Sequence, residues 1–155
     1  MAFNPLEELH LLPGIDPIAD AFSGTVNTDI VEVQGEGVLF VIGKGVGTTG
    51  TSVITVDACS TIGAAATTAI AFNYRASTTP DTWGDVTAAT ATGFTTTAGS
   101  SQRYMIDVPA ANVGATGYAY VRLTATESAV AAVLGYVDIY VYGLRYAPQP
   151  SSLID

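Results

Sequence analysis

The stretch VLGYVDIYVYG, residues 133–143, decides the fold class because two kinds of side chain alternate along it. Successive side chains of a β-strand point to opposite faces, so a period of two indicates a strand with one buried face. Here an aliphatic side opposes a side rich in tyrosine: Val133, Val137, Ile139 and Val141 against Leu134, Tyr136, Asp138, Tyr140 and Tyr142. We therefore predict a strand whose aliphatic side faces a core.

The same period recurs in short runs from residue 25 onward, separated by turns rich in Gly, Ser and Thr. These runs are TDIVEV (28–33), TSVITVDACS (51–60), TAIAFNYR (68–75), QRYMIDV (102–108) and YAYVRLTA (118–125). The run GVLFVIGK (37–44) is apolar on both faces, which predicts a central strand that is covered on both faces. A weak strand is expected at 85–90, within the otherwise looped segment 77–101, and long helices are not expected. The chain is therefore predicted to be all-β, an antiparallel β-sandwich or β-barrel of roughly seven to nine strands.

The first 23 residues depart from this pattern because three prolines interrupt any regular period. The segment is nevertheless rich in apolar residues: Phe3, Leu6, Leu9, Leu11, Leu12, Ile15 and Ile18. Apolar groups on an extended segment are stabilised only when another surface covers them. We expect an extended N-terminal arm (1–23) that packs on a neighbouring subunit or partner, a β-sandwich domain (24–146) and a C-terminal tail (147–155). A frayed terminus is the alternative for the arm.

Length and charge limit the possible partners. The 155 residues suit one domain with a full hydrophobic core. Only five residues are Lys or Arg, and the formal net charge is −9 at pH 7. Because Lys and Arg supply most of the affinity for nucleic acid and for anionic membranes, we expect neither as a partner. We also expect no secretory signal and no membrane span, and the single cysteine excludes an internal disulfide.

The segment GVGTTG, residues 45–50, matches the G-x-G-x-x-G pattern of dinucleotide-binding loops. That pattern binds a pyrophosphate only where a helix begins at its last glycine. Here Gly50 is followed by TSVITVDACS, whose alternating β-branched residues predict a strand. Lys44 is followed by glycine rather than by Ser or Thr, so a phosphate loop does not fit either. We therefore expect a flexible hairpin loop with glycines at positive φ and no bound nucleotide.

Groups for catalysis and metal binding are scarce, since the chain holds one histidine, His10, and one cysteine, Cys59. No G-x-S-x-G elbow is present to hold a nucleophilic serine, and a zinc site needs several Cys or His ligands. Carboxylates that could pair for glycoside hydrolysis are scattered along the chain: Asp81, Asp85, Asp107, Glu127 and Asp138. We expect no enzymatic activity, no catalytic residue, no metal and no cofactor.

Five tyrosines fall on one face of two neighbouring segments, and Arg122 and Asp138 share that face. The tyrosines are Tyr118, Tyr120, Tyr136, Tyr140 and Tyr142. Three interpretations stay open: a second buried layer, a contact surface for another protein, or a platform on which a sugar stacks. Because Tyr and Arg are enriched at protein interfaces, these tyrosines, Arg122 and the apolar residues of the arm are the interface candidates.

Three segments resemble a family of structural proteins from tailed bacteriophages and prophages that decorate or cement the icosahedral head. They span residues 22–60, 81–128 and 133–146. The resemblance rests on the strand–glycine loop–strand unit that ends in Cys59, on the loop DTWG…GFTTTAGS (81–100) and on the strand GYAYVRL (117–123). It implies a jelly-roll-like fold on the outer surface of the capsid, bound to the major capsid protein, with no enzymatic activity.

On this interpretation the chain is made in the host cytoplasm and joins the virion as a homo-oligomer, either a dimer or a trimer. The alternative function is a carbohydrate-binding β-sandwich module of a phage fibre or an adhesin. That module would use Trp83, the only tryptophan, together with the tyrosine side of the strands.

Overall fold

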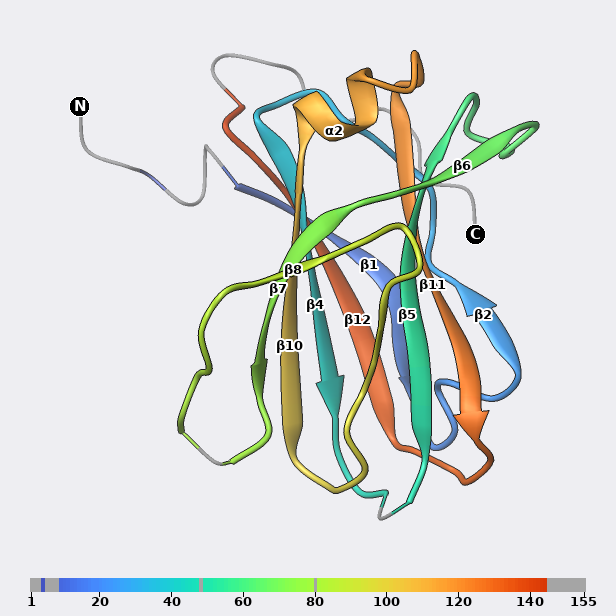
Figure 1. The fold of residues 1–155 in the computed structure, drawn as a ribbon, viewed down its shortest axis with the longest axis vertical. Helices are drawn as coiled ribbons and strands as arrows, with labels where there is room; N and C mark the ends of the chain where they lie inside the picture. The colour runs from blue at the N-terminus through green and yellow to red at the C-terminus, as the bar shows by residue number, and fades with distance from the viewer. Residues whose placement is uncertain (1–3, 5–8, 48, 80, 145–155) are drawn as a thin grey trace.

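The structure, a computed structural model, describes residues 4, 9–47, 49–79 and 81–144 of the chain. In this part the chain forms twelve strands and one short helix, α2 (Ala110–Gly114), and Figure 1 shows the strands in two layers. The first sheet has the order β1 (Leu9–Ile18), β12 (Gly135–Tyr142), β4 (Gly37–Lys44), β10 (Gln102–Pro109), β7 (Phe72–Ser77) and β8 (Thr87–Ala89). The second sheet has the order β2 (Thr25–Asn27), β11 (Tyr120–Ala129), β5 (Thr51–Cys59) and β6 (Thr67–Ile70), with β3 (Val31–Glu32) beside β11 and β9 (Phe94–Thr95) beside β5.

The pairing of strands is that of a jelly roll. β1 pairs with β12 and β2 with β11, while β4 pairs with β10 and β5 with β6, all antiparallel. The chain therefore folds over on itself as a double ribbon that wraps around one core. The expected all-β sandwich is confirmed, but seven to nine strands was too low a number. The prediction missed β1, β2 and β9 and counted β6 and β7 as one strand, whereas β3 and β8 lie within the predicted runs 28–33 and 85–90. β9 is only two residues long, which is too short for an alternating pattern to show.

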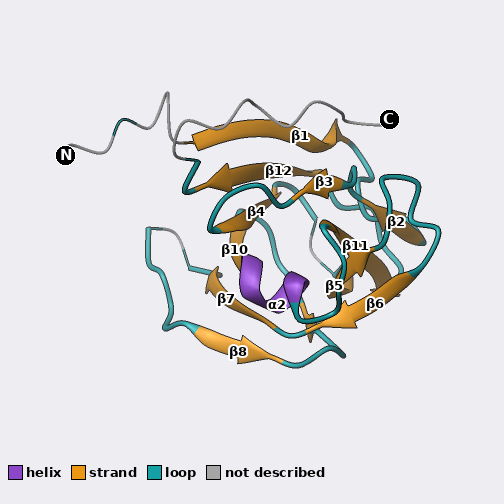
Figure 2. Ribbon diagram, turned by 90° about the horizontal axis from the view of Figure 1, so that it is seen from above, coloured by secondary structure: helices purple, strands orange, loops and turns teal. Residues whose placement is uncertain are grey.

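The core lies between the two sheets and is built from the aliphatic sides of the long strands. Phe40, Ile106 and Ile139 of the first sheet are fully buried, as are Val56 and Leu123 of the second. Helix α2 lies over one end of the sandwich, as Figure 2 shows from above, and its Val113 is buried. The alternation in the sequence thus identifies the inward side of β5, β10, β11 and β12 correctly.

The N-terminal segment is part of the sandwich, so the predicted arm is wrong for the residues described. β1 is the edge strand of the first sheet, with Leu9 opposite Tyr142 and Leu12 opposite Ile139. Leu12 belongs to the core, Ile15 packs against it, and Phe22 is buried. The prolines did not prevent pairing because an edge strand tolerates missing donors and register shifts, which occur here after Pro13. Phe3, Leu6 and the tail 147–155 lie outside the described residues.

The glycine-rich loop after β4 is not a hairpin, because β4 and β5 belong to different sheets. None of its three glycines has a positive φ, contrary to expectation. They are needed because this loop packs closely on residues 131–134: Gly45 N donates to Leu134 O at 2.7 Å, and Leu134 N donates to Val46 O at 3.0 Å. A Cβ atom at Gly50 would overlap the side chain of Val133. Close backbone approach, rather than chain reversal, explains the glycines.

The run TAIAFNYR was predicted as one strand and is in fact two. Its first part forms β6 in the second sheet, and its last part begins β7 in the first sheet. Only Ala71 separates them, so the alternating pattern continues across the crossing and conceals it.

Candidate functional site

The outer face of the first sheet carries a continuous apolar and aromatic surface, which we call the tyrosine face. It consists of the outward side chains of β1, β12, β4 and β10: Leu9, Leu11, Leu39, Val41, Met105, Tyr136, Tyr140 and Tyr142. The register places Tyr140 between Leu11 and Leu39 on the neighbouring strands. Leu11 is 54% exposed, and the others are half-buried. The structure therefore brings five of the interface candidates together here, Leu9, Leu11, Tyr136, Tyr140 and Tyr142.

Two glycines of β4 make room for tyrosine rings of β12. Gly37 lies directly opposite Tyr142, and Gly43 directly opposite Tyr136. A Cβ atom at either glycine would overlap the facing ring, so each ring lies across the bare backbone of β4. The Tyr142 hydroxyl reaches β10, where it donates to Asp107 Oδ1 at 2.7 Å. Burial and this hydrogen bond raise the pKa of Tyr142, which fixes the hydroxyl as a donor.

A carboxylate interrupts the tyrosine face. Asp138 lies between Pro13 on β1 and Val41 on β4, two residues without a polar side chain. Burial raises the pKa of Asp138 above its usual value. Burial, followed by the charge of Asp138, also raises the pKa of Tyr140. Charge on this surface is therefore poorly hydrated, as expected for a face that favours apolar contact.

The remaining interface candidates lie elsewhere, so the single surface expected from the sequence does not exist. β11 and β12 follow each other in the chain but belong to opposite sheets, and their outward sides face in opposite directions. Tyr120 and Arg122 lie on the outside of the second sheet, while Tyr118 packs against the core. Leu12 and Ile15 are directed inward, and Ile18 is exposed at the end of β1.

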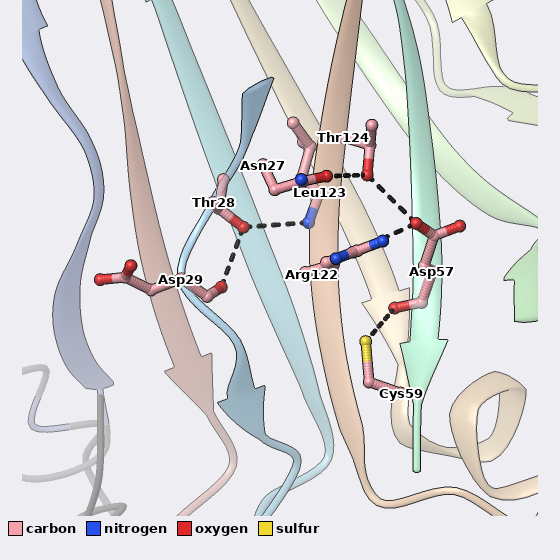
Figure 3. Close-up of polar contacts among 8 residues, drawn as sticks. All are labelled: Asn27, Thr28, Asp29, Asp57, Cys59, Arg122, Leu123 and Thr124. Carbon is pink, nitrogen blue, oxygen red and sulfur yellow. Dashed lines mark hydrogen bonds and ion pairs between the residues drawn. The ribbon is translucent and has the colours of Figure 1, made fainter. Parts of the chain in front are cut away.

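The outside of the second sheet is polar and internally paired, as Figure 3 shows. Arg122 Nε donates to Asp57 Oδ2 at 3.3 Å across the β11–β5 pair. The Thr124 hydroxyl lies 3.1 Å from the same carboxylate oxygen and 2.8 Å from Asn27 Oδ1. Neighbouring side chains thus satisfy these groups, which argues against a vacant binding site on this face.

Cys59 ends β5 beside this network and is fully buried. Its Sγ lies 3.7 Å from the carbonyl oxygen of Asp57. Burial raises the pKa of the Cys59 thiol, so the sulfur stays protonated and is a poor nucleophile. Within the described residues no group of three His, Cys, Asp or Glu could hold a metal ion. None of the helices in this part of the chain is long and apolar enough to cross a membrane.

Lys44, which precedes the glycine-rich loop, is also buried, with 2% of its surface exposed. Its ammonium donates to Gly50 O at 3.1 Å, to Thr97 O at 2.8 Å and to Gln102 Oε1 at 3.4 Å. Burial lowers the pKa of Lys44. All three N–H donors of the ammonium are used within the protein, so Lys44 joins the segments that contain Gly50, Thr97 and Gln102. No donor remains for a phosphate.

A cleft of about 480 Å³ lies at the end of the tyrosine face where β4 ends and β10 begins. Two aromatic residues and five polar ones contribute to its lining: Trp83, Tyr136, Lys44, Ser77, Asp81, Ser101 and Arg103. Trp83 and Tyr136 stand out in the sequence by residue type alone. Asp81 and Arg103 carry no such signal, because they reach the cleft from a loop and a strand that only the folded sheet brings together.

No protein-family model, no curated protein and no solved structure matches the chain. Function must therefore be inferred from the fold and from the surfaces described above.

Proposed function

We propose that the chain is a non-enzymatic structural protein of a phage virion, which binds the outside of an icosahedral head and stabilises it. Its partner is the major capsid protein, and the chain acts as a homo-oligomer of two or three copies without a cofactor. The resemblance of residues 22–60, 81–128 and 133–146 to head decoration proteins supports this proposal. The jelly-roll pairing is compatible with it, since viral capsid domains use this architecture, although the same architecture also serves other functions.

The tyrosine face is the observation that carries the proposal. It combines aliphatic and aromatic side chains on a regular sheet, and glycines of β4 fix two of its rings. Rings that are already ordered lose little conformational freedom when a partner covers them. Tyr is among the residue types enriched where binding energy concentrates. The polar outside of the second sheet, with its paired Arg122 and Asp57, suits the side that stays in water.

The test is co-sedimentation of the purified chain with undecorated heads of the phage or prophage that encodes it. Leu11→Glu places a charge at the most exposed point of the tyrosine face and should reduce head binding about tenfold or more, since a buried unpaired charge costs well over 1.4 kcal/mol. Thr126→Glu adds the same charge on the exposed outside of β11 and is the matched control. Circular dichroism should show that both variants remain folded.

Two results would contradict the proposal. Absence of the unaltered chain from the pellet at micromolar concentration would show that the capsid is not its partner. Equal binding of Leu11→Glu and Thr126→Glu to heads would show that the docking surface is not the tyrosine face.

A further inference from the structure

The cleft beside Trp83 is separate from the groups that pair on the outside of the second sheet. It lies at the end of the first sheet opposite to α2, because α2 follows the end of β10 and the cleft surrounds its beginning. Leu134 and Gly135 at the beginning of β12 form part of its wall. Five segments distant in the sequence therefore meet there: Pro17 of β1, the end of β4, the end of β7 with the loop around Trp83, and the beginnings of β10 and β12.

We propose that this cleft binds a neutral saccharide, with one or two pyranose rings placed against Trp83 and Tyr136. The proposal goes beyond capsid binding and does not depend on it. A volume of about 480 Å³ falls within the range of roughly 300–1,000 Å³ typical of small-molecule sites. The C–H groups on one face of a pyranose carry partial positive charge, which matches the negative face of an aromatic ring.

Both aromatic rings are held in place before a ligand arrives. Tyr136 lies across Gly43, and the guanidinium carbon of Arg103 is 5.9 Å from its ring centroid. The guanidinium carbon of Arg75 is 6.0 Å from the centroid of Trp83. Arg75 Nε also donates to Gly84 O at 3.0 Å, which fastens the loop next to Trp83 onto β7. Because the rings are already oriented, ligand binding requires little ordering.

Three polar residues of the cleft are exposed and have no side-chain hydrogen bond within the part of the chain that the structure describes: Asp81, Ser101 and Arg103. Asp81 and Arg103 also form no ion pair with each other there, so in the free protein water solvates these groups and a ligand can replace it. An acceptor, a multiple donor and a hydroxyl around one cleft complement the hydroxyls of a sugar, each of which both donates and accepts. This contrasts with Arg122 and Asp57 on the other sheet, which satisfy each other.

The backbone at two of these residues is unusual. Asp81 has φ 61° and Ser101 has φ 58°, and they are two of the three non-glycine residues with positive φ in the described chain. Such conformations are uncommon for residues with a Cβ atom and persist where the surroundings hold them. Ser101 N donates to Gly45 O at 2.9 Å, which is one such restraint. Two uncommon conformations on one cleft agree with a site shaped for a ligand.

Other ligand classes fit less well. A purely apolar ligand would leave Asp81 and Arg103 without partners after their water is displaced, which is unfavourable. A phosphate or an acidic sugar would meet Asp81, and Lys44, the other cation in the lining, is fully used by its three acceptors. A neutral saccharide satisfies both charged groups without repulsion.

Binding can be followed by tryptophan fluorescence, because Trp83 is the only tryptophan of the chain. An array of neutral oligosaccharides built from glucose, galactose, mannose and N-acetylglucosamine selects the probe, with sialylated and uronic-acid glycans on the same array. The disaccharide with the strongest signal is then titrated while tryptophan emission is followed, and calorimetry repeats the titration. We expect saturable binding accompanied by a change in Trp83 emission. Calorimetry should show that Trp83→Ala and Arg103→Gln each bind the disaccharide about tenfold or more weakly than the unaltered chain.

The matched control is Tyr120→Ala, which removes an aromatic ring from the other sheet and should leave affinity unchanged. Trp83→Ala should still co-sediment with heads, and Leu11→Glu should still bind the saccharide. Failure of the saccharide proposal can therefore be distinguished from failure of the capsid-binding proposal. A silent array, binding of acidic glycans alone, or equal affinities for Trp83→Ala and the unaltered chain would overturn the inference.

Discussion

The ring of Tyr136 lies across Gly43 on the neighbouring strand, at a point where a Cβ atom would overlap the ring. Gly43→Ala should therefore push the ring off β4 and lower the free energy of unfolding by about 1–3 kcal/mol, the usual effect of overpacking. Urea denaturation measures this loss. The same variant should weaken saccharide binding, because Tyr136 contributes to the cleft.

A second glycine provides the control for this prediction. A Cβ atom at Gly114, in α2, would meet no other atom within 4 Å. Gly114→Ala should leave stability unchanged or raise it by about 0.5–1 kcal/mol, because alanine restricts the unfolded chain and favours helix. Equal effects of the two substitutions would show that the contact between Tyr136 and Gly43 has no particular role.

Lys44→Met should lower the free energy of unfolding by about 1–3 kcal/mol at neutral pH. The methionine keeps the length of the side chain but leaves Gly50 O and Thr97 O without the ammonium donor. Equilibrium dialysis of the unaltered chain with ATP, NAD and inorganic phosphate should show no binding, because the ammonium is occupied. Phosphate binding that disappears in Lys44→Met would contradict this assignment.

The same pair of proteins makes a prediction about pH. Burial lowers the pKa of Lys44 from 10.5, so between its folded pKa and 10.5 the unfolded chain holds a proton that the folded chain has released. The Lys44 contribution to the free energy of unfolding therefore rises with pH in that window and is constant below it. Chemical denaturation at a series of alkaline pH values should show that the difference in free energy of unfolding between the unaltered chain and Lys44→Met grows toward pH 10.5. A difference that does not change with pH would contradict this prediction.

Asp138→Asn tests whether the tyrosine face disfavours charge, through the dependence of the free energy of unfolding on pH from 3.8 upward. The pKa of Asp138 is raised from 3.8 by burial, so the folded chain keeps a proton that the unfolded chain loses. Its stabilising contribution is complete below pH 3.8 and is lost as pH rises through the folded pKa. The stability of Asp138→Asn relative to the unaltered chain should therefore increase from pH 3.8 upward and then level off. Asp85→Asn, at an exposed position, controls for the loss of one negative charge.

Two adjacent leucines distinguish a strand of the domain from a free arm. Leu12 is 6% exposed in the core, and Leu11 is 54% exposed on the tyrosine face. Leu12→Ala should lower the free energy of unfolding by about 2–5 kcal/mol, whereas Leu11→Ala should change it by less than about 0.5 kcal/mol. Chemical denaturation of both variants provides the measurement. If β1 were an arm without a place in the sandwich, the two substitutions would have the same small effect.

The sequence predicts single strands well where alternation is strong and uninterrupted. GVLFVIGK coincides with β4, and the aliphatic side of 133–143 is the buried side of β12. Side-chain periodicity is a local property, so it records which side of a strand is buried. It does not record which strands pair, so the sequence alone does not predict that Leu11 lies opposite Tyr140.

Surfaces formed by several segments could not be predicted for the same reason. Tyr120 and Tyr136 belong to consecutive strands with similar patterns, which predicts one shared tyrosine surface, yet the jelly roll places those strands in opposite sheets. The cleft depends on Asp81 and Arg103, which lie far apart in the chain and which no pattern in the sequence links to each other. Their proximity follows from the pairing of β7 with β10.

The pairing of β1 with β12 also determines the order in which this protein can be completed. β1 is synthesised long before its partner, so its edge and Leu12 stay uncovered until the chain has been made as far as β12. Contacts between such distant segments form slowly, and an unpaired edge invites association during the delay. Leu11 and Tyr140 cannot meet before β12 has been synthesised, so the tyrosine face cannot be complete until most of the chain has been made. If the tyrosine face binds the capsid as proposed, a chain that has not yet paired β1 with β12 lacks the complete binding surface.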